Sequence, residues 1–308
     1  MRLTETIRAH DSLSGIETEE RPLGAAILGI PAGPGLAAAL LPVVRRSSED
    51  GSPMTIPVLF DRSGVIAVIK PTGLASQAPP GIASVESLMR EQLFGDAFQA
   101  DLAAGRRRHP GGFLGLPHRL DRAVSGVLLM ATTPRAARQL SRQFEQRTID
   151  KAYLAVVSAA VPPTTLAEAF EWRDLIRKVP DEPRAEIVAG DITGAREAIT
   201  EGHLLTAESD RLLLSLSPRT GRMHQLRLQA AARGMPIVGD TLYGGQPLPE
   251  AASLDERRRP IALHAWRITF QDPDSAERIS LEAPPPEALP WTSPAFRSVV
   301  SQPPSQSP

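Results

Sequence analysis

An aspartate stands between two arginines in a short polar segment near the middle of the sequence. The segment reads Pro117-His118-Arg119-Leu120-Asp121-Arg122, and a glycine-bounded loop leads from it into the apolar run 127–131. Neighbouring guanidinium groups favour the ionised form of a carboxyl group, because opposite charges attract. An ionised carboxylate in a fixed position can act as a nucleophile or as a base. Taken alone, this pattern is more typical of an ion pair that organises a loop.

The longer string His118–Gly126 resembles the signature His-Arg-Leu-Asp-Arg-x-Thr-Ser-Gly of the RluA-type RNA pseudouridine synthases, with Val124 in place of threonine. Other segments resemble the same family in the same order along the chain, over about residues 57–284. The first, Val58–Gly73, ends in Lys-Pro-Thr-Gly and has Ile69 in place of asparagine, and the second, Asp150–Val157, contains Lys-x-Tyr-x-Ala-x-Val. The third, Arg219–Arg227, has Met223 in place of threonine and continues to Gly244. A weaker match is Leu263-His264-Ala265.

The resemblance implies an enzyme that isomerises uridine to pseudouridine in ribosomal or transfer RNA, with Asp121 as the catalytic residue. It also implies that Tyr153 packs against the target base. Arg227 would pair with the catalytic carboxylate, as the fork of a guanidinium group allows. The matching motifs place further residues at the substrate: His118, Arg119, Leu120, Arg122, Arg222, His224 and Gln225. Because the isomerisation involves no redox step and no external group, we expect neither an organic cofactor nor a metal.

Three histidines, His118, His224 and His264, fall in the matching segments and raise the question of a metal site. None of them has a local ligand spacing such as His-Glu-x-x-His, and the chain has no cysteine. We therefore expect these histidines to make hydrogen bonds that organise loops.

The distribution of charge favours a nucleic-acid partner more than its sum does. The formal net charge is −1, yet residues 106–151 contain ten basic residues against three acidic ones, and residues 211–239 contain five arginines and no acid. Local positive fields of this kind can hold a phosphate backbone. Charge alone is equally compatible with helix faces that are simply solvated.

The elements that must position these residues are typical of a mixed α/β domain. Short β-branched runs at 58–60 and 65–69 flank a turn and predict a hairpin. Further strands are predicted at 127–131, 153–157 and 211–217. Helices are predicted from Thr133-Pro134 onward and over 223–233, the second closed by Gly234. This order favours an α+β fold over a doubly wound sheet, and the family resemblance implies a mixed, largely antiparallel central sheet flanked by helices and loops.

Composition divides the chain into three parts. Residues 1–54 are rich in Ala, Gly and Pro and are predicted to form a poorly patterned extension without a recognisable RNA-binding domain. Residues 55–289 would form the catalytic domain, and residues 290–308 a Pro- and Ser-rich tail. The apolar runs are too short to span a bilayer, no secretory signal is visible, and the absence of cysteine fits a reducing compartment. We expect a cytoplasmic monomer.

Two other functions compete with the synthase. A catalytically silent RNA-binding module with the same fold would not need Asp121, Tyr153 and Arg227 together. A hydrolase of nucleosides or glycans needs a second carboxylate near Asp121, and the matching segments offer only Asp240.

Overall fold

The computed structural model describes residues 54–106, 111–159, 167–190, 192–288 and 290–300. The predicted extension therefore lies outside the described residues apart from Met54. The end of the predicted tail, 301–308, lies outside them as well.

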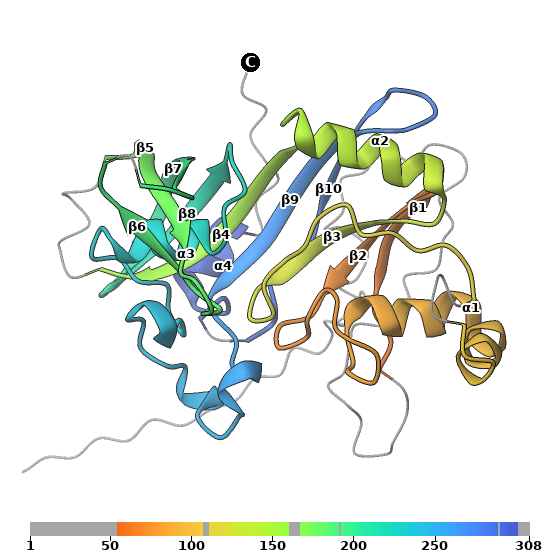
Figure 1. The fold of residues 1–308 in the computed structure, drawn as a ribbon. Helices are drawn as coiled ribbons and strands as arrows, with labels where there is room; N and C mark the ends of the chain where they lie inside the picture. The colour runs from red at the N-terminus through yellow and green to blue at the C-terminus, as the bar shows by residue number, and fades with distance from the viewer. Residues whose placement is uncertain (1–53, 107–110, 160–166, 191, 289, 301–308) are drawn as a thin grey trace, which may run out of the picture. The chain divides into compact units, whose positions relative to one another are not determined.

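A ten-stranded sheet dominates the described part of the chain (Figure 1). Its main order is β1-β2-β3-β9-β4-β8-β7-β5-β6, and β10 pairs with β9. Every pair is antiparallel except β3 with β9. The strands are β1 (Val58–Arg62), β2 (Val65–Lys70), β3 (Ser125–Ala131), β4 (Asp150–Ser158), β5 (Ala169–Lys178), β6 (Ala185–Val188), β7 (Arg196–Glu208), β8 (Arg211–Pro218), β9 (Leu263–Gln271) and β10 (Arg278–Glu282). The predicted mixed, largely antiparallel α+β fold is confirmed.

The helices and 3₁₀ turns are placed around this sheet. They are α1 (Val85–Ala103), α2 (Pro134–Glu145), α3 (Gln225–Ala231), η2 (Thr241–Tyr243), η3 (Pro249–Ala251), η4 (Glu256–Arg258) and α4 (Pro294–Val300). The helix predicted at Thr133-Pro134 is confirmed, because the Thr133 side chain accepts a hydrogen bond from Ala136 N at 3.1 Å and Pro134 opens α2. The predicted hairpin is confirmed too, and it turns at Ser63 and Gly64, which both have positive φ.

Strands β2 and β3 are buried on both faces, and this divides the core into two layers. One layer contains Val65, Val127 and Leu129 together with Ala136 and Leu140 of α2. The alternate residues of the same strands pack in the opposite layer, which also includes β4, β8 and part of α1. Because side chains alternate along a strand, near-continuous apolar runs are what such a position requires.

A glycine allows the chain to enter β3 next to β9. Gly126 has φ +118, and a Cβ atom built there would lie 2.2 Å from the carbonyl oxygen of Ala265. The close parallel pairing of Ser125 and Gly126 with His264 and Ala265 thus needs a residue without a side chain. This pairing fixes the end of the loop that carries Asp121.

Two predicted boundaries differ from the structure. Helix α3 is shorter than predicted, because the chain enters it through His224 in the left-handed conformation (φ 53°, ψ 25°). Residues 290–300 are not a tail, since Trp291 and Phe296 are 6% and 0% exposed and belong to the main core. The Pro- and Ser-rich composition of this region concealed two aromatic anchors. No helix in the described ranges is long and apolar enough to cross a membrane.

Candidate active site

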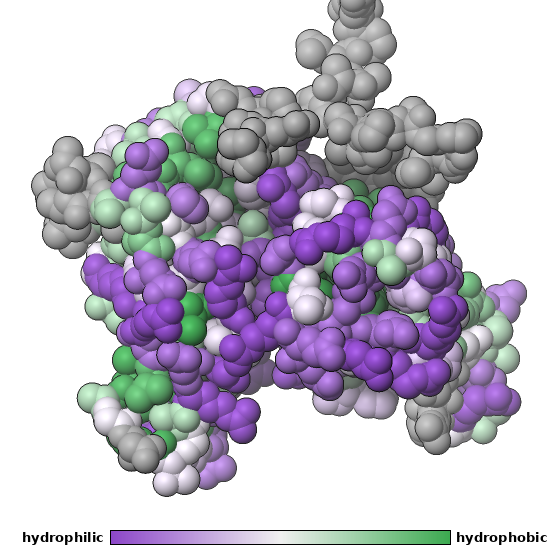
Figure 2. All heavy atoms as spheres, turned by 90° about the horizontal axis from the view of Figure 1, so that it is seen from above, coloured by the Kyte–Doolittle hydropathy of each residue, from purple (hydrophilic) through white to green (hydrophobic). Residues whose placement is uncertain are grey.

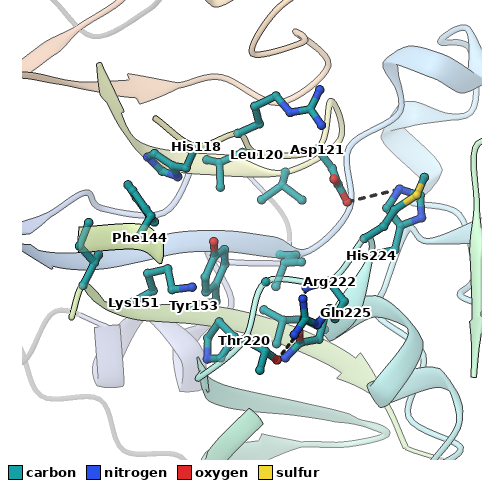
Figure 3. A pocket seen from close by; sticks show the side chains of 18 of the residues that line it. His118, Leu120, Asp121, Phe144, Lys151, Tyr153, Thr220, Arg222, His224 and Gln225 are labelled. Atoms are coloured by element: carbon teal, nitrogen blue, oxygen red, sulfur yellow. Dashed lines mark hydrogen bonds and ion pairs between the residues drawn. The ribbon is translucent and has the colours of Figure 1, made fainter. Parts of the chain in front are cut away.

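Every predicted site residue lines one cavity, which has a volume of about 1840 Å³. Figure 3 shows this cavity with some of these residues labelled. Its wall is built by the loop before β3, the start of β4 and the segment 217–227 between β8 and α3. These segments are far apart in the sequence, and the sheet brings them together because β3, β9, β4 and β8 are consecutive neighbours.

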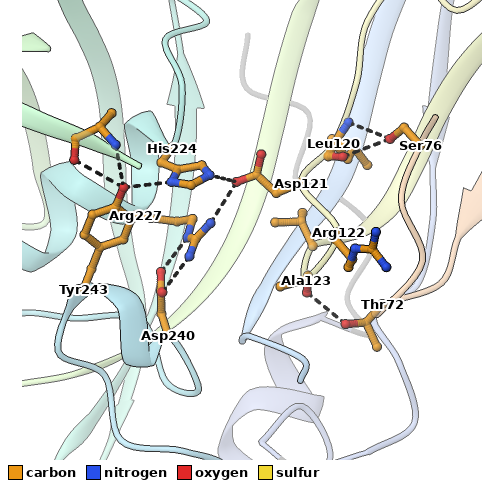
Figure 4. Close-up of polar contacts among 12 residues, drawn as sticks. Thr72, Ser76, Leu120, Asp121, Arg122, Ala123, His224, Arg227, Asp240 and Tyr243 are labelled. Atoms are coloured by element: carbon orange, nitrogen blue, oxygen red, sulfur yellow. Dashed lines mark hydrogen bonds and ion pairs between the residues drawn. The ribbon is translucent and has the colours of Figure 1, made fainter. Parts of the chain in front are cut away.

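Asp121 and Asp240 share one guanidinium group (Figure 4). Arg227 donates from Nε and Nη2 to the two carboxylate oxygens of Asp240, at 2.6 and 2.7 Å, and from Nη1 to Asp121 Oδ2 at 3.2 Å. Burial disfavours the charge of Arg227, but the bonds to Asp240 and the charges of both aspartates outweigh it and raise its pKa. The side chain of Asp240 is 1% exposed and that of Asp121 is 37% exposed. Only Asp121 is therefore open to a substrate.

His224 approaches the same carboxylate from the other side. Its Nε2 lies 3.6 Å from Asp121 Oδ2, and its Nδ1 lies 2.7 Å from the hydroxyl of Tyr243. Burial lowers the pKa of His224, although the nearby charges of Asp121 and Asp240 oppose this. The neutral ring is thus favoured at neutral pH. Oδ2 of Asp121 faces Arg227 and His224, and Oδ1 has no partner among the described residues.

The backbone around Asp121 is held by the segment Lys70–Ser76, which leaves β2. Lys70 is fully buried and its Nζ donates to the carbonyl oxygens of Pro71, Arg122 and Val124, at 2.8, 3.1 and 2.6 Å. Thr72 Oγ1 donates to Ala123 O at 2.9 Å. Ser76 Oγ bonds both the N–H and the carbonyl of Leu120, at 3.0 and 2.9 Å (Figure 4). These bonds hold the backbone before and after Asp121 and so fix the position of its carboxylate.

We expect Lys70→Met to destabilise the protein and to reduce turnover. Burial lowers the pKa of Lys70 to about 7, yet three carbonyl oxygens surround the Nζ and favour the ammonium form, which has a proton for each. A methionine fills similar space but leaves these buried carbonyls short of a donor, at a cost on the order of 3 kcal/mol. Thermal unfolding and steady-state kinetics measure both effects. Unchanged turnover in a folded variant would show that the loop does not depend on Lys70.

Tyr153 and Lys151 project from β4 toward the side of the cavity where His118 and Leu120 lie (Figure 3). Burial raises the pKa of Tyr153, and the negative charge of Asp121 adds to this effect. The ring is half-buried and offers an aromatic surface in the cavity. Burial lowers the pKa of Lys151, with a further contribution from the charge of Arg147.

Two of the predicted substrate-binding residues have polar groups that are already occupied by the protein. His118 stacks on Phe144, its Nε2 accepts the N–H of Leu129 at 2.9 Å, and burial lowers its pKa to about 3. Gln225 is 4% exposed and uses its amide to bond Thr220, Thr200, the N–H of Arg222 and the carbonyl of Ile199. Both side chains line the cavity, but the geometry favours a role in holding its walls.

Basic side chains without an acidic partner in the described ranges line the same cavity. Seven basic side chains that line the cavity make no ion pair with an acidic side chain in the described ranges: Arg119, Arg122, Arg147, Lys151, Lys178, Arg196 and Arg222. Burial lowers the pKa of Arg222, and the charges of Arg147 and Arg196 lower it further, so these side chains repel one another without an anion. Seen from above in Figure 2, on the side where α2 lies, hydrophilic side chains predominate. The cavity is suited to a polyanion.

Sequence reasoning missed Asp240, Lys70 and Tyr243 as parts of the site. Each lies in a segment that matches the family, but burial, which only the fold reveals, gives them their roles.

Within the described ranges, no group of three His, Asp or Glu side chains is arranged to hold a metal ion.

Similarity to known proteins places this fold and cavity in a class of RNA-modifying enzymes. The profile of the family described as RNA pseudouridylate synthase matches residues 64–232. The chain is 32% identical to ribosomal large subunit pseudouridine synthase D of Xanthomonas campestris pv. campestris, over 92% of this chain and 77% of that one. It is also 32% identical to the dual-specificity RNA pseudouridine synthase RluA of Salmonella typhi, over 74% and 92% of the two chains.

A solved human structure, RNA pseudouridylate synthase domain containing 1, shares the fold with a TM-score of 0.56 and 22% identity. That similarity covers 75% of this chain and 84% of the human one. The chain therefore belongs to the RNA pseudouridylate synthase family, of the RluA type, whose members are isomerases. The family resemblance read from the sequence is confirmed.

Proposed function

We propose that this protein isomerises uridine to pseudouridine in structured RNA, ribosomal or transfer, and that Asp121 is its catalytic residue. The observation that carries the proposal is the state of the Asp121 carboxylate. Arg227 and His224 face one oxygen, and the other has no partner within the described ranges. The side chain opens into a cavity with an aromatic wall and with cations that lack acidic partners in the same ranges. An oriented carboxylate with one free oxygen is suited to act on a bound sugar.

The reaction breaks one bond to the ribose and forms another. The bond between N1 of uracil and C1′ breaks while Asp121 attacks the ribose or removes a proton from it. The base turns and C5 bonds to C1′; in the same step the bond between Asp121 and the ribose breaks, or the abstracted proton returns to the ribose. The C5 proton is then lost while N1 is protonated. Atoms and electrons balance without an external reactant. Arg227 would orient the carboxylate, and its paired charge with Asp240 leaves the negative charge of Asp121 available.

Access to the ribose requires that the target nucleotide leave its stack, because the glycosidic bond of a paired base is enclosed. Tyr153 offers a surface on which the extruded base can stack. Arg119, Arg122 and Arg222 line the cavity, have no acidic partner in the part of the chain that the structure describes, and would bind flanking phosphates. This division of roles explains why a protein with a net charge of −1 can bind RNA.

The hydrolase alternative lacks support from the geometry. Asp240 is buried and both of its oxygens accept from Arg227, so it cannot activate water. Of the other acidic residues that line the cavity, Asp150 and Glu201 are paired with arginines. Glu145 is exposed at the end of α2 and makes no hydrogen bond or ion pair with Asp121, Arg227 or His224 in the described ranges. A silent RNA-binding module would have no need for a carboxylate that is held by Arg227 yet open to the cavity.

We expect the purified protein to form pseudouridine in ribosomal or transfer RNA without releasing uracil. The two RNAs are transcribed without modification, treated with the enzyme and mapped by a pseudouridine-specific chemical label, and free base is measured by chromatography. Release of uracil would favour the hydrolase, and RNA binding without either product would favour the silent module.

We further expect the protein to be a monomer and to work in the cytoplasm. Sedimentation measures the oligomeric state, and cell fractionation measures the location.

A further inference from the structure

Tyr243 touches both side chains that contact Asp121. The centre of its ring lies 5.1 Å from Arg227 Cζ, and its hydroxyl lies 2.7 Å from His224 Nδ1. The same hydroxyl lies 3.1 Å from Ala185 N and 3.3 Å from Ala185 O, at the start of β6 (Figure 4). Tyr243 itself is not among the residues that line the cavity. It can therefore act on the reaction only through its neighbours.

We propose that Tyr243 is a positioning residue for the reaction, because its hydroxyl fixes the tautomer of His224 that presents Nε2–H to Asp121. The inference rests on the proposed catalytic role of Asp121. It assigns a task to the second of the two tyrosines in the chain.

Counting protons around the hydroxyl leads to this tautomer. The N–H of Ala185 donates to the Tyr243 oxygen, and the single hydroxyl proton can go to His224 Nδ1 or to the carbonyl of Ala185. The hydroxyl oxygen lies 2.7 Å from Nδ1 and 3.3 Å from the carbonyl oxygen of Ala185, and the shorter hydrogen bond is the stronger one. A neutral imidazole whose Nδ1 accepts a hydrogen bond must have its proton on Nε2.

The surroundings of Nε2 favour the same arrangement. Asp121 Oδ2 lies 3.6 Å away and, when ionised, can only accept. The opposite tautomer would point a nitrogen lone pair at this oxygen, and the two would repel. Tyr243 offers a donor at Nδ1, and Asp121 offers an acceptor near Nε2. Both therefore favour the tautomer with its proton on Nε2.

The charge of His224 matters as much as its tautomer. The charged and titratable groups that face it are Asp121 from the loop before β3, Arg227 from α3, and Asp240 and Tyr243 from the segment around η2. Burial lowers the pKa of His224, and the O–H of Tyr243 bonds only to an unprotonated Nδ1 and so favours the neutral ring further. A neutral ring points its Nε2–H toward Asp121 without neutralising the carboxylate. An imidazolium would form an ion pair with the carboxylate and reduce its reactivity.

The variant Tyr243→Phe tests this role, because it keeps the ring beneath Arg227 and removes the hydroxyl. Without the O–H donor, Nδ1 can take a proton more easily, and the pKa of His224 rises. We expect the acid limb of the kcat profile to move to higher pH by roughly one pH unit, the equivalent of one hydrogen bond. The loss of turnover should then be largest on the acid side of the profile and small near pH 8. A loss that is equal at every pH would overturn the proposal.

A background variant separates this effect from a general disturbance of the fold. In His224→Gln, the amide nitrogen of glutamine can replace Nε2–H, but nothing titrates. Adding Tyr243→Phe to this background should change turnover by the same factor at all pH values. A pH-dependent change there would show that the hydroxyl acts on another group.

The tautomer can also be read without substrate. Nitrogen chemical shifts of His224 in the free protein should show a proton on Nε2 and none on Nδ1, and Tyr243→Phe should weaken this preference. A proton on Nδ1 in the unmodified protein would overturn the inference. This measurement does not depend on turnover, so an absence of pseudouridine formation would refute the proposed function without deciding the role of Tyr243.

Discussion

Asp121→Asn is expected to reduce pseudouridine formation by roughly 10³-fold or more, because the amide cannot act as nucleophile or base. The substitution preserves shape, and the amide oxygen can still accept from Arg227 Nη1. RNA affinity should be unchanged or slightly higher, since a negative charge leaves a cavity that binds phosphates. Single-turnover assays with labelled RNA and filter-binding titrations measure the two quantities on the same preparation.

Asp96→Asn is the matched control for this change. Asp96 lies exposed on α1, makes no ion pair in the described part of the chain and does not line the cavity. The same loss of charge there should leave both turnover and affinity unchanged. Turnover by the Asp121→Asn protein at the level of this control would refute the assignment of Asp121.

The order of sequence motifs predicted the fold and the side chains that line the cavity, for a physical reason. Asp121, Tyr153 and Arg227 lie on or beside β3, β4 and α3, and each motif combines a reactive side chain with the apolar run that places it in the sheet. Once β3, β9, β4 and β8 are neighbours, these side chains meet. The family resemblance implied a sheet that brings the motifs together, whereas the periodicity of apolar residues does not predict which strands are neighbours.

What the sequence could not reveal is how each polar group divides its hydrogen bonds. Gln225 and His118 belong to motifs that line the cavity, but the protein occupies the amide of Gln225 and the Nε2 of His118. Lysine is usually found at the surface, but Lys70 is completely buried. Trp291 and Phe296 lie in a region whose prolines and serines indicate a tail. Both side chains are nevertheless buried in the core, because removing their large apolar surface from water is favourable.

Asp240 shows the same limit with a larger consequence for function. Its sequence setting, a glycine-flanked turn, is typical of a loop residue, and we considered it only as the second carboxylate of a hydrolase. The structure instead makes it the partner that occupies two donors of Arg227 and leaves the third for Asp121. The arrangement of one guanidinium between two carboxylates retains one negative charge, and the exposed carboxylate is the one that can use it.

Arg227→Met is expected to lower turnover by roughly 10²-fold or more and the free energy of unfolding by about 3 kcal/mol or more. Turnover falls because the carboxylate of Asp121 loses the donor that orients it. Stability falls because Asp240, with a side chain that is 1% exposed, becomes a buried charge without a partner. RNA affinity should change less than turnover, since Arg227 is already paired and contributes little free positive charge.

The double variant Arg227→Met with Asp240→Asn separates the two effects. Replacing the carboxylate by an amide removes the buried charge, so thermal unfolding should return most of the way toward that of the unmodified protein. Turnover should stay low, because nothing restores the donor to Asp121. If turnover recovered together with stability, Arg227 would be a structural residue only, and the orientation of Asp121 would have to depend on His224 and the loop held by Lys70.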